Sequence, residues 1–264
     1  MKPADDLLRS GDYARKQIYS RSRLVRWSHG SRFEVARALV APQAGGRLLD
    51  YGCGDGTFVA MVHADFAEAV GVDVDPAQVE ETARRLGRLP GVRFGLTPAA
   101  ARAAQTGSTA SPAEGAWDVV TCMEVLEHCL EDERRRVIGE LRRLVAADGR
   151  VVVSVPIEIG PALAGKQLAR AAAALRGLGD YRHRERYSPV EFARALVGLG
   201  VARPVLEGHG FGGLYRYHGH KGFDYRVVAG ELAERFSIVR RVYSPMRALG
   251  AFLNSQAWFM CVPR

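Results

Sequence analysis

The sequence predicts an α/β fold built on a mostly parallel, seven-stranded sheet. From about residue 46 onward, short apolar runs alternate with helical patterns, a spacing typical of βαβ units. A glycine-rich turn at residues 52–56 joins the first of these runs to a helix. The chain ends in two runs rich in aromatic and β-branched residues, 236–244 and 256–262, which we expect to pair as a hairpin with an antiparallel last strand.

The first five strands follow one another along the core, with helices or loops between them. They are expected at 47–52, 67–75, 92–96, 116–123 and 148–156. Helices are expected to begin near Asp55 and at Pro76, where the missing N–H of proline suits a first helical turn. A further helix is expected over Glu131–Ala146, followed by a turn at Asp148-Gly149 that opens the fifth strand. Residues 97–115, rich in Ala, Ser, Thr and Pro, are expected to form a loop.

Length and composition fit one globular domain. The chain has 264 residues, of which 47% are hydrophobic and 25% charged, enough to bury a core without disulfides or metals. We expect a single domain, 1–264, with a helical lead-in at 1–42, a core at 43–156, a cap insertion after the fifth strand at 157–223 and a C-terminal helix and strand pair at 224–264. The insertion is too long for a connector, so it is predicted to cover the site. Its residues 168–179 are predicted to form a helix whose apolar face packs on the domain or on a lipid-bearing substrate.

Cysteine usage and hydropathy predict the compartment. The four cysteines are scattered, without a CxxC pair, which suits a reducing cytosol. The N-terminus lacks the apolar run of a signal peptide, and no stretch approaches the roughly 20 residues that a membrane span requires. We therefore expect a cytoplasmic protein without a transmembrane segment, for which attachment to a membrane surface stays open.

The net charge of +8 at pH 7 favours an anionic partner without identifying it. Many of the basic residues lie beside acidic ones on a predicted solvated helix face, as in 131–143. Two stretches that mix arginine, histidine and aromatic residues, 180–187 and 215–226, could line a site for an anionic acceptor.

The strongest motif is LLDYGCGDG at residues 48–56. Its glycines allow backbone amides to approach a ligand closely. A dinucleotide-binding fingerprint would need glycine in place of Thr57, and a phosphate-binding loop would need a lysine that this stretch lacks. Asp50 and Asp55 would oppose a pyrophosphate but suit a ligand that carries an ammonium and a sulfonium. Asp73, at the end of the second strand, can accept hydrogen bonds from both hydroxyls of a ribose.

Together these motifs resemble the class I S-adenosylmethionine-dependent methyltransferases over roughly residues 47–156. The resemblance implies their Rossmann-like fold and S-adenosyl-L-methionine as cofactor. TCMEVLEHC, residues 121–129, closely resembles a segment of the ubiquinone-pathway O-methyltransferases. In that family the methionine packs on the cofactor, and an arginine about twenty residues before the glycine turn contacts its carboxylate; the matching residues are Met123 and Arg32.

The cofactor-binding residues predicted from these motifs lie on the lead-in and on the ends of four strands. They are Arg32, Asp50, Tyr51, Gly52, Cys53, Gly54, Asp73, Val74, Thr97, Cys122 and Met123. One position departs from the family pattern. Where family members often place an acidic residue against the adenine, this chain has FGLTPAA, so Thr97 or a backbone group has to substitute.

Methyl transfer to a hydroxyl requires a positioned nucleophile and a base that removes its proton. The candidates are His128, Glu124 and His183, with His209, His218 and His220 of the insertion as further ones. A second interpretation is a divalent metal. Glu124, Glu127 and His128 would share one face if the segment is helical, and His183 matches the additional ligand of the small-RNA 3′-terminal 2′-O-methyltransferases. We favour the metal-free interpretation, in which Glu124 and His128 orient the acceptor.

The sequence thus predicts an S-adenosylmethionine-dependent transfer of a methyl group to a hydroxyl of a small molecule. Sugar, polyketide and quinone-like acceptors fit, including anionic or lipid-linked ones. The alternatives are a metal-dependent RNA ribose 2′-O-methyltransferase and a non-catalytic cofactor-binding scaffold. A nucleic-acid partner is disfavoured because no RNA-binding module is visible, and the set of Asp50, Gly52, Gly54 and Asp73 argues against the scaffold. The oligomeric state is not predicted.

Overall fold

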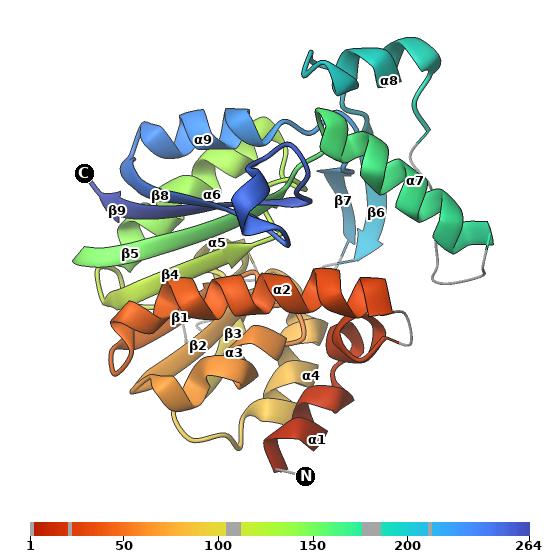
Figure 1. Cartoon of the computed structure of the whole chain (residues 1–264). Coiled ribbons are helices and arrows are strands. Elements are labelled where there is room, and N and C mark those ends of the chain that lie inside the picture. The colour runs from red at the N-terminus through yellow and green to blue at the C-terminus, as the bar shows by residue number, and fades with distance from the viewer. Residues whose placement is uncertain (1–2, 21–22, 104–111, 176–185, 211–212) are drawn as a thin grey trace.

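The computed structural model describes residues 3–20, 23–103, 112–175, 186–210 and 213–264. Its centre is a seven-stranded sheet with helices on both faces (Figure 1). The strand order is β3-β2-β1-β4-β5-β9-β8. The first five strands pair in parallel, whereas β9 runs antiparallel to both β5 and β8. The predicted fold class is therefore confirmed.

The strands of this sheet lie close to their predicted positions. They are β1 (Arg47–Tyr51), β2 (Glu68–Asp73), β3 (Val92–Leu96), β4 (Trp117–Met123), β5 (Val145–Pro156), β8 (Phe236–Ser244) and β9 (Gln256–Pro263). The inner strands are buried on both faces, which explains why they read as continuous apolar runs rather than as alternating ones.

Helices cover the two faces of the sheet and form two separate cores with it. The helices are α1 (Pro3–Ser10), α2 (Arg23–Val40), α3 (Thr57–Val62), α4 (Pro76–Leu86), α5 (Pro98–Ala103), α6 (Glu131–Leu144), α7 (Pro161–Leu175), α8 (Pro189–Leu196) and α9 (Tyr225–Ala233). Side chains of α6 and α9 belong to one core, and those of α2 and α3 to the other. Short helical turns occur at Ala14–Ile18, Ala41–Gln43, His63–Asp65 and Arg247–Leu249.

Two local expectations were wrong. Residues 98–103 form α5 rather than a loop, because Pro98 suits a first turn and the hydroxyl of Thr97 accepts a hydrogen bond from the Ala100 N–H at 3.3 Å. Strand β5 begins at Val145, so α6 ends earlier than predicted and Asp148-Gly149 lies inside the strand. The register against β4 shifts in this region, and a Cβ at Gly149 would lie 2.8 Å from the Trp117 carbonyl oxygen.

The segment between β5 and α9 projects from the edge of the sheet (Figure 1). It contains α7, α8 and a separate antiparallel pair, β6 (Val205–Gly210) and β7 (Gly213–His218). Helix α7 begins at Pro161 rather than at residue 168, and residues 176–179 of the predicted helix lie outside the described part. The predicted limits of the insertion and of the lead-in stay predictions. Among the described helices, none combines the length and the apolar character that crossing a membrane requires.

Candidate active site

The glycine turn between β1 and α3 needs its glycines for two reasons. Gly52, Gly54 and Gly56 all have positive φ values, of 79°, 52° and 69°. A Cβ at Gly52 would lie 2.3 Å from Cγ2 of Val125, and one at Gly56 would lie 2.7 Å from Cγ2 of Thr82. A Cβ at Gly54 would meet no described atom within 4 Å. The turn is therefore packed closely at both ends and open in its middle, where a ligand has room.

Asp73 at the end of β2 lies against this turn. Its Oδ2 accepts a hydrogen bond from the Gly54 N–H at 2.9 Å, and its Oδ1 accepts one from the Val74 N–H at 2.8 Å. Neighbouring Val74 is 42% exposed although it is apolar. The carboxyl ends of β1 and β2 thus place a fixed carboxylate and an exposed apolar side chain next to each other.

The other predicted cofactor residues of β1 and β4 lie deeper. Asp50 is buried and accepts a hydrogen bond from the Thr121 hydroxyl at 2.7 Å, and burial raises its pKa to about 7. The Tyr51 hydroxyl donates to Glu140 at 2.7 Å. Burial also raises the thiol pKa of both Cys53 and Cys122. Met123 is partly buried against the core of α2 and α3. The negative charge of Asp50 is therefore weakened at neutral pH.

A cleft of about 1330 Å³ opens at this edge of the sheet. Of the predicted cofactor residues, those lining it are Tyr51, Gly52, Asp73, Val74 and Thr97. It also touches Glu124 and His128 after β4, and Tyr215, Arg216 and Tyr217 of β7. Six predicted cofactor residues are not among the described residues of its lining: Arg32, Asp50, Cys53, Gly54, Cys122 and Met123. One continuous cavity therefore joins the glycine turn to the candidate catalytic residues.

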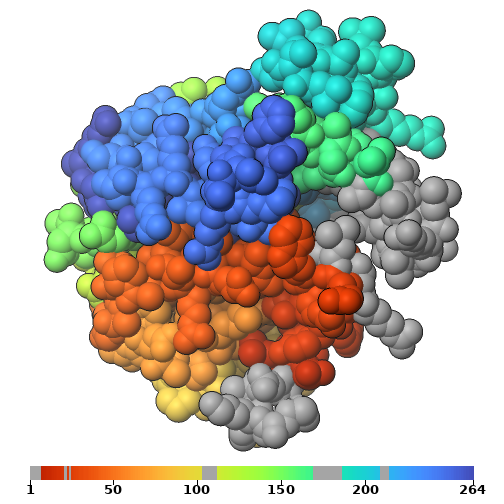
Figure 2. Space-filling view, in the orientation of Figure 1, coloured from red at the N-terminus to blue at the C-terminus, as the bar shows by residue number. Residues whose placement is uncertain are grey.

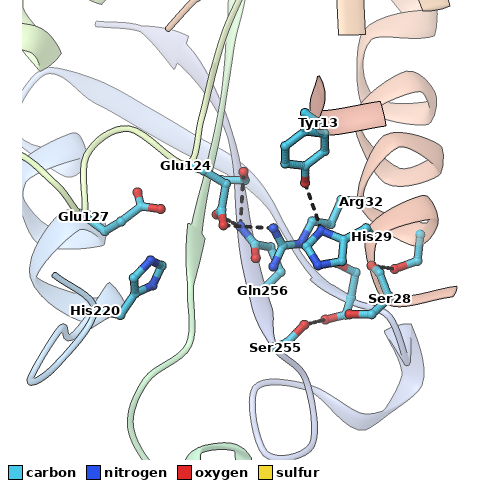
Figure 3. Close-up of polar contacts among 12 residues, drawn as sticks. Tyr13, Ser28, His29, Arg32, Glu124, Glu127, His220, Ser255 and Gln256 are labelled. Carbon is cyan, nitrogen blue, oxygen red and sulfur yellow. Dashed lines mark hydrogen bonds and ion pairs between the residues drawn. The ribbon is translucent and has the colours of Figure 1, made fainter. Parts of the chain in front are cut away.

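Glu124 lies where β4 ends and has a strained backbone. Among the described residues it alone combines a side chain with a left-handed conformation, at φ 57°. Its carboxylate accepts a hydrogen bond from Arg32 Nη1 at 3.0 Å and another from the side-chain amide of Gln256 (Figure 3). The structure thus brings together two residues that the sequence assigned to different roles, Arg32 and Glu124. Gln256 was not predicted, because nothing in its local sequence indicates this contact.

The lead-in is tied to the glycine turn through Tyr13. The Tyr13 N–H donates to Asp55 Oδ2 at 2.8 Å, and its hydroxyl lies 2.9 Å from Nδ1 of His29 (Figure 3). Asp55 also accepts a hydrogen bond from the Thr57 hydroxyl at the start of α3. Burial lowers the pKa of His29 to about 3, so this imidazole is neutral. The N-terminal helices therefore hold the turn from outside, although their sequence carries no motif that predicts this.

His128 is oriented by the hairpin β6–β7. Its Nδ1 lies 3.0 Å from the carbonyl oxygen of His218, and the His218 N–H donates back to the His128 carbonyl at 2.9 Å. A carbonyl can only accept, so Nδ1 carries the hydrogen and Nε2 keeps its lone pair. Burial is the main cause that lowers the pKa of His128. The side chain is 42% exposed. The geometry therefore supplies a neutral imidazole beside the cleft, whose Nε2 has no hydrogen-bond partner among the described residues and lies 4.0 Å from Glu127 Oε1.

Buried titratable side chains lie around this histidine. Glu127 is fully buried, and neither of its carboxylate oxygens has a hydrogen-bond partner among the described residues. Burial and nearby Glu124 raise its pKa well above the usual range. The His220 ring packs edge-on against His128, with ring centroids 5.1 Å apart. Glu158, which the sequence did not single out, accepts from Lys166 Nζ at 2.9 Å and lies 3.6 Å from His220 Nδ1.

The predicted metal ligands do not converge within the described residues. No group of three or more His, Cys, Asp or Glu side chains in that part of the chain is arranged to hold a metal ion. His183, the fourth residue of that set and a predicted catalytic candidate, lies outside the described residues, as does the side chain of His209. Glu124 turns instead toward Arg32 and Gln256.

The fold and this site define a Rossmann-like methyltransferase. A family model described as "Methyltransferase domain" matches residues 27–202. The chain therefore belongs to this family, and it is an S-adenosylmethionine-dependent methyltransferase.

Known proteins resemble the chain at low identity. A ubiquinone biosynthesis O-methyltransferase of Xanthomonas axonopodis pv. citri is 28% identical over 181 residues, covering 67% of this chain and 71% of the relative. A Pyrococcus horikoshii protein of known structure has a TM-score of 0.57 at 17% identity, covering 96% of this chain and 99% of its own. The N-methyltransferase NodS of Bradyrhizobium japonicum, solved with S-adenosyl-L-homocysteine, has a TM-score of 0.51 at 14% identity, with coverages of 98% and 96%. These two structural likenesses concern the fold.

Proposed function

We propose that this methyltransferase transfers the methyl group of S-adenosylmethionine to a hydroxyl oxygen of a small molecule, with His128 as the base. One observation carries the proposal. The Nε2 lone pair of His128 is free because Nδ1 donates to the His218 carbonyl, and the residue lines the same cleft as Gly52 and Asp73. A second feature supports it: several relatives, including the Xanthomonas protein, are named as O-methyltransferases.

The residues at the sheet edge fit the cofactor. The open face of Gly54 leaves room for the methionine part, and Asp73 stands where ribose hydroxyls would donate to it. Exposed Val74 offers an apolar surface to the adenine, beside Thr97. Arg32 would release the carboxylate of Glu124 and bind the cofactor carboxylate in its place. When bound, S-adenosylmethionine supplies the methyl group, and the electron pair of the broken carbon–sulfur bond stays on sulfur.

His128 has the two properties that a base needs here. Its lowered pKa keeps the ring neutral at pH 7, so Nε2 can accept the acceptor's hydroxyl proton as that oxygen bonds to the methyl carbon. The carbonyl of His218 then stabilises the imidazolium by accepting from Nδ1. Because the side chain is 42% exposed, the proton can leave to solvent. Glu124, held by the side-chain amide of Gln256, would orient the acceptor, and the proton is assigned to His128.

The wall of the cleft indicates the kind of acceptor. Tyr215 and Tyr217 of β7 lie with their ring centroids 5.4 Å apart, and Arg216 lies between them in sequence. Aromatic faces and a guanidinium suit a flat or anionic acceptor, such as a quinone-like or polyketide hydroxyl. A sugar hydroxyl fits the same base equally well.

The test is transfer of labelled methyl from S-adenosylmethionine into fractionated metabolites and RNA, with and without a chelator. We expect label in a small-molecule fraction as a methyl ether, and no effect of the chelator. Label in RNA that the chelator abolishes would assign the chain to the metal-dependent ribose 2′-O-methyltransferases instead. If no fraction is labelled and the protein does not bind the cofactor, the chain would be assigned to the non-catalytic scaffolds instead.

A further inference from the structure

Four stretches of more than 20 residues contain no acidic residue, and one of them, 82–113, lies apart from the other three in the sequence. Those three segments are residues 13–33, 159–179 and 235–264, although 29 acidic residues occur in the whole chain. All three segments contain arginine. Elsewhere basic residues usually have acidic neighbours, as in α6. The positive charge of these segments is only partly compensated, by carboxylates from outside them: Arg15 and Lys16 pair with Asp12, Arg32 pairs with Glu124, and Lys166 pairs with Glu158.

The three segments meet at one place in the structure. Arg32 of α2 and Gln256 of β9 both bind the carboxylate of Glu124. The N–H of Ile157, two residues before segment 159–179, donates to the carbonyl of Ser255 at 2.9 Å, which brings the start of that segment close to the same point. From there the N-terminal turns of α2, the loop 245–255 and helix α7 lead to the surface. Figure 2 shows the loop in dark blue, α2 in orange and α7 in green side by side on one face.

Large apolar side chains are exposed along these segments, and we call them the apolar rim. Its members are Trp27, Leu168, Met246, Leu249, Phe252 and Leu253, with exposed fractions from 36% to 76%. Arg23, Arg26 and Arg247 are exposed beside them and form no ion pair with any described residue. Scattered apolar residues on a surface are ordinary, but a group of them among unpaired arginines marks an interaction site.

We propose that the apolar rim docks the enzyme on the surface of an anionic phospholipid bilayer. Trp27, Phe252 and the leucines would enter the boundary between head groups and acyl chains, and the arginines would pair with lipid phosphates. Charge complementarity selects this occupant, because the segments offer no carboxylate that an anionic surface would repel. A second copy of the chain fits less well, since two such rims would bring like charges together. The inference does not depend on the acceptor, and its test does not use activity.

The first test is co-sedimentation of the full chain with vesicles of phosphatidylcholine, with and without phosphatidylglycerol. We expect binding to the anionic vesicles that weakens as salt is raised, because screening reduces the arginine contribution. On phosphatidylcholine alone, binding is expected to be at least about tenfold weaker. Wild-type chain that stays in the supernatant with anionic vesicles at low salt would overturn the proposal.

Variants separate the rim from the rest of the surface. The pair Phe252→Ser and Leu253→Ser is expected to weaken binding to the anionic vesicles about tenfold. Arg23→Gln with Arg26→Gln is expected to weaken it by a similar factor at low salt and to flatten its salt dependence. The matched control is Val227→Ser, a residue of α9 that is 49% exposed and lies outside the rim; it is expected to bind like the wild type.

Two controls keep the result interpretable. Melting temperature and S-adenosylhomocysteine affinity, measured for each variant, show whether the fold and the cofactor site are intact. Folded rim variants that bind vesicles as strongly as the wild type would overturn the proposal. It would also be overturned by self-association in light scattering that Phe252→Ser abolishes while vesicles bind no protein, since the rim would then serve a second copy.

Discussion

The cofactor side and the acceptor side of the cleft are built in different ways. The cofactor side comes from two neighbouring parallel strands, whose ends place Asp73 within 2.9 Å of the Gly54 N–H. The acceptor side is assembled from distant parts of the chain: Arg32, Glu124 and Gln256 meet at one carboxylate, and His128 is held by His218. One half of the site is therefore local and the other depends on tertiary packing.

The two sides also differ in how their charges are compensated. Asp73 is held by backbone N–H groups, which are fixed by the sheet and by the turn. Glu124 is instead held by two long side chains, and buried Glu127 has no hydrogen-bond partner among the described residues. Ligand binding and pH should therefore change the side-chain contacts on the acceptor side more strongly than those on the cofactor side. Substitutions on the cofactor side should mainly change the affinity for S-adenosylmethionine.

The largest expected effect is on the acceptor side, at His128. His128→Gln should lower kcat by about 10²- to 10⁴-fold, because the side chain that takes the acceptor proton is lost. The dissociation constant of S-adenosylmethionine should stay unchanged, since His128 is assigned to the acceptor. Steady-state kinetics and calorimetry measure the two quantities.

The control for this variant is His63→Gln, because His63 lies in a short helical turn after α3 and its Nδ1 is 3.0 Å from the Ala60 carbonyl oxygen. It should leave kcat unchanged. In the wild type, the lowered pKa of His128 predicts that kcat/KM declines only below about pH 6.5 on the acid side. A His128→Gln enzyme with the wild-type kcat would remove this residue from the mechanism.

The second effect concerns the cofactor side. Asp73→Ala should weaken the binding of S-adenosylmethionine on the order of a hundredfold, because hydrogen bonds from two ribose hydroxyls to a charged group are lost. Asp75→Ala is the matched control, since Asp75 caps α4 by accepting from the Ala77 N–H and is not assigned to the ligand. Equal affinities of the two variants in calorimetry would contradict the ribose assignment.

The same difference explains what could be predicted from the sequence. The glycine turn and Asp73 are contiguous motifs on strand ends, so their positions followed from the order of strands and helices. The contacts of Gln256, Tyr13 and Glu158 join residues that are far apart in sequence, and no local pattern encodes them. Helix α5 was missed because its Ala-rich sequence also suits a loop until Thr97 caps it. His183 lies outside the described residues, so its role stays a prediction.

A smaller effect concerns stability and pH. Burial raises the pKa of Asp50 from its usual value near 4 to about 7. Between these two pH values, Asp50 is protonated in the folded state and ionised in the unfolded state. The contribution of Asp50 to stability is therefore present at low pH and is lost as the pH rises toward 7. Asp50→Asn should flatten the decline of melting temperature from about pH 4 to pH 7. An unchanged slope would show that Asp50 stays ionised.

The smallest effect links the two sides of the cleft. Glu124→Gln removes the negative charge that pairs with Arg32 at 3.0 Å. If Arg32 receives the cofactor carboxylate, the variant should bind S-adenosylmethionine about two- to fivefold more tightly, because the competing anion is gone. Arg32→Gln should change the affinity in the opposite direction, as measured by calorimetry. Weaker binding by Glu124→Gln would show that Glu124 contacts the cofactor itself.

The most direct test of the proposed cofactor site is hydrogen exchange of the protein with and without S-adenosyl-L-homocysteine. We predict stoichiometric binding and slower exchange of the backbone N–H groups at residues 52–56 and 73–75, where the glycine turn meets Asp73. Little change is expected in α9, which lies away from the glycine turn. Binding that leaves the exchange of 52–56 and 73–75 unchanged would contradict the placement of the cofactor at this edge of the sheet.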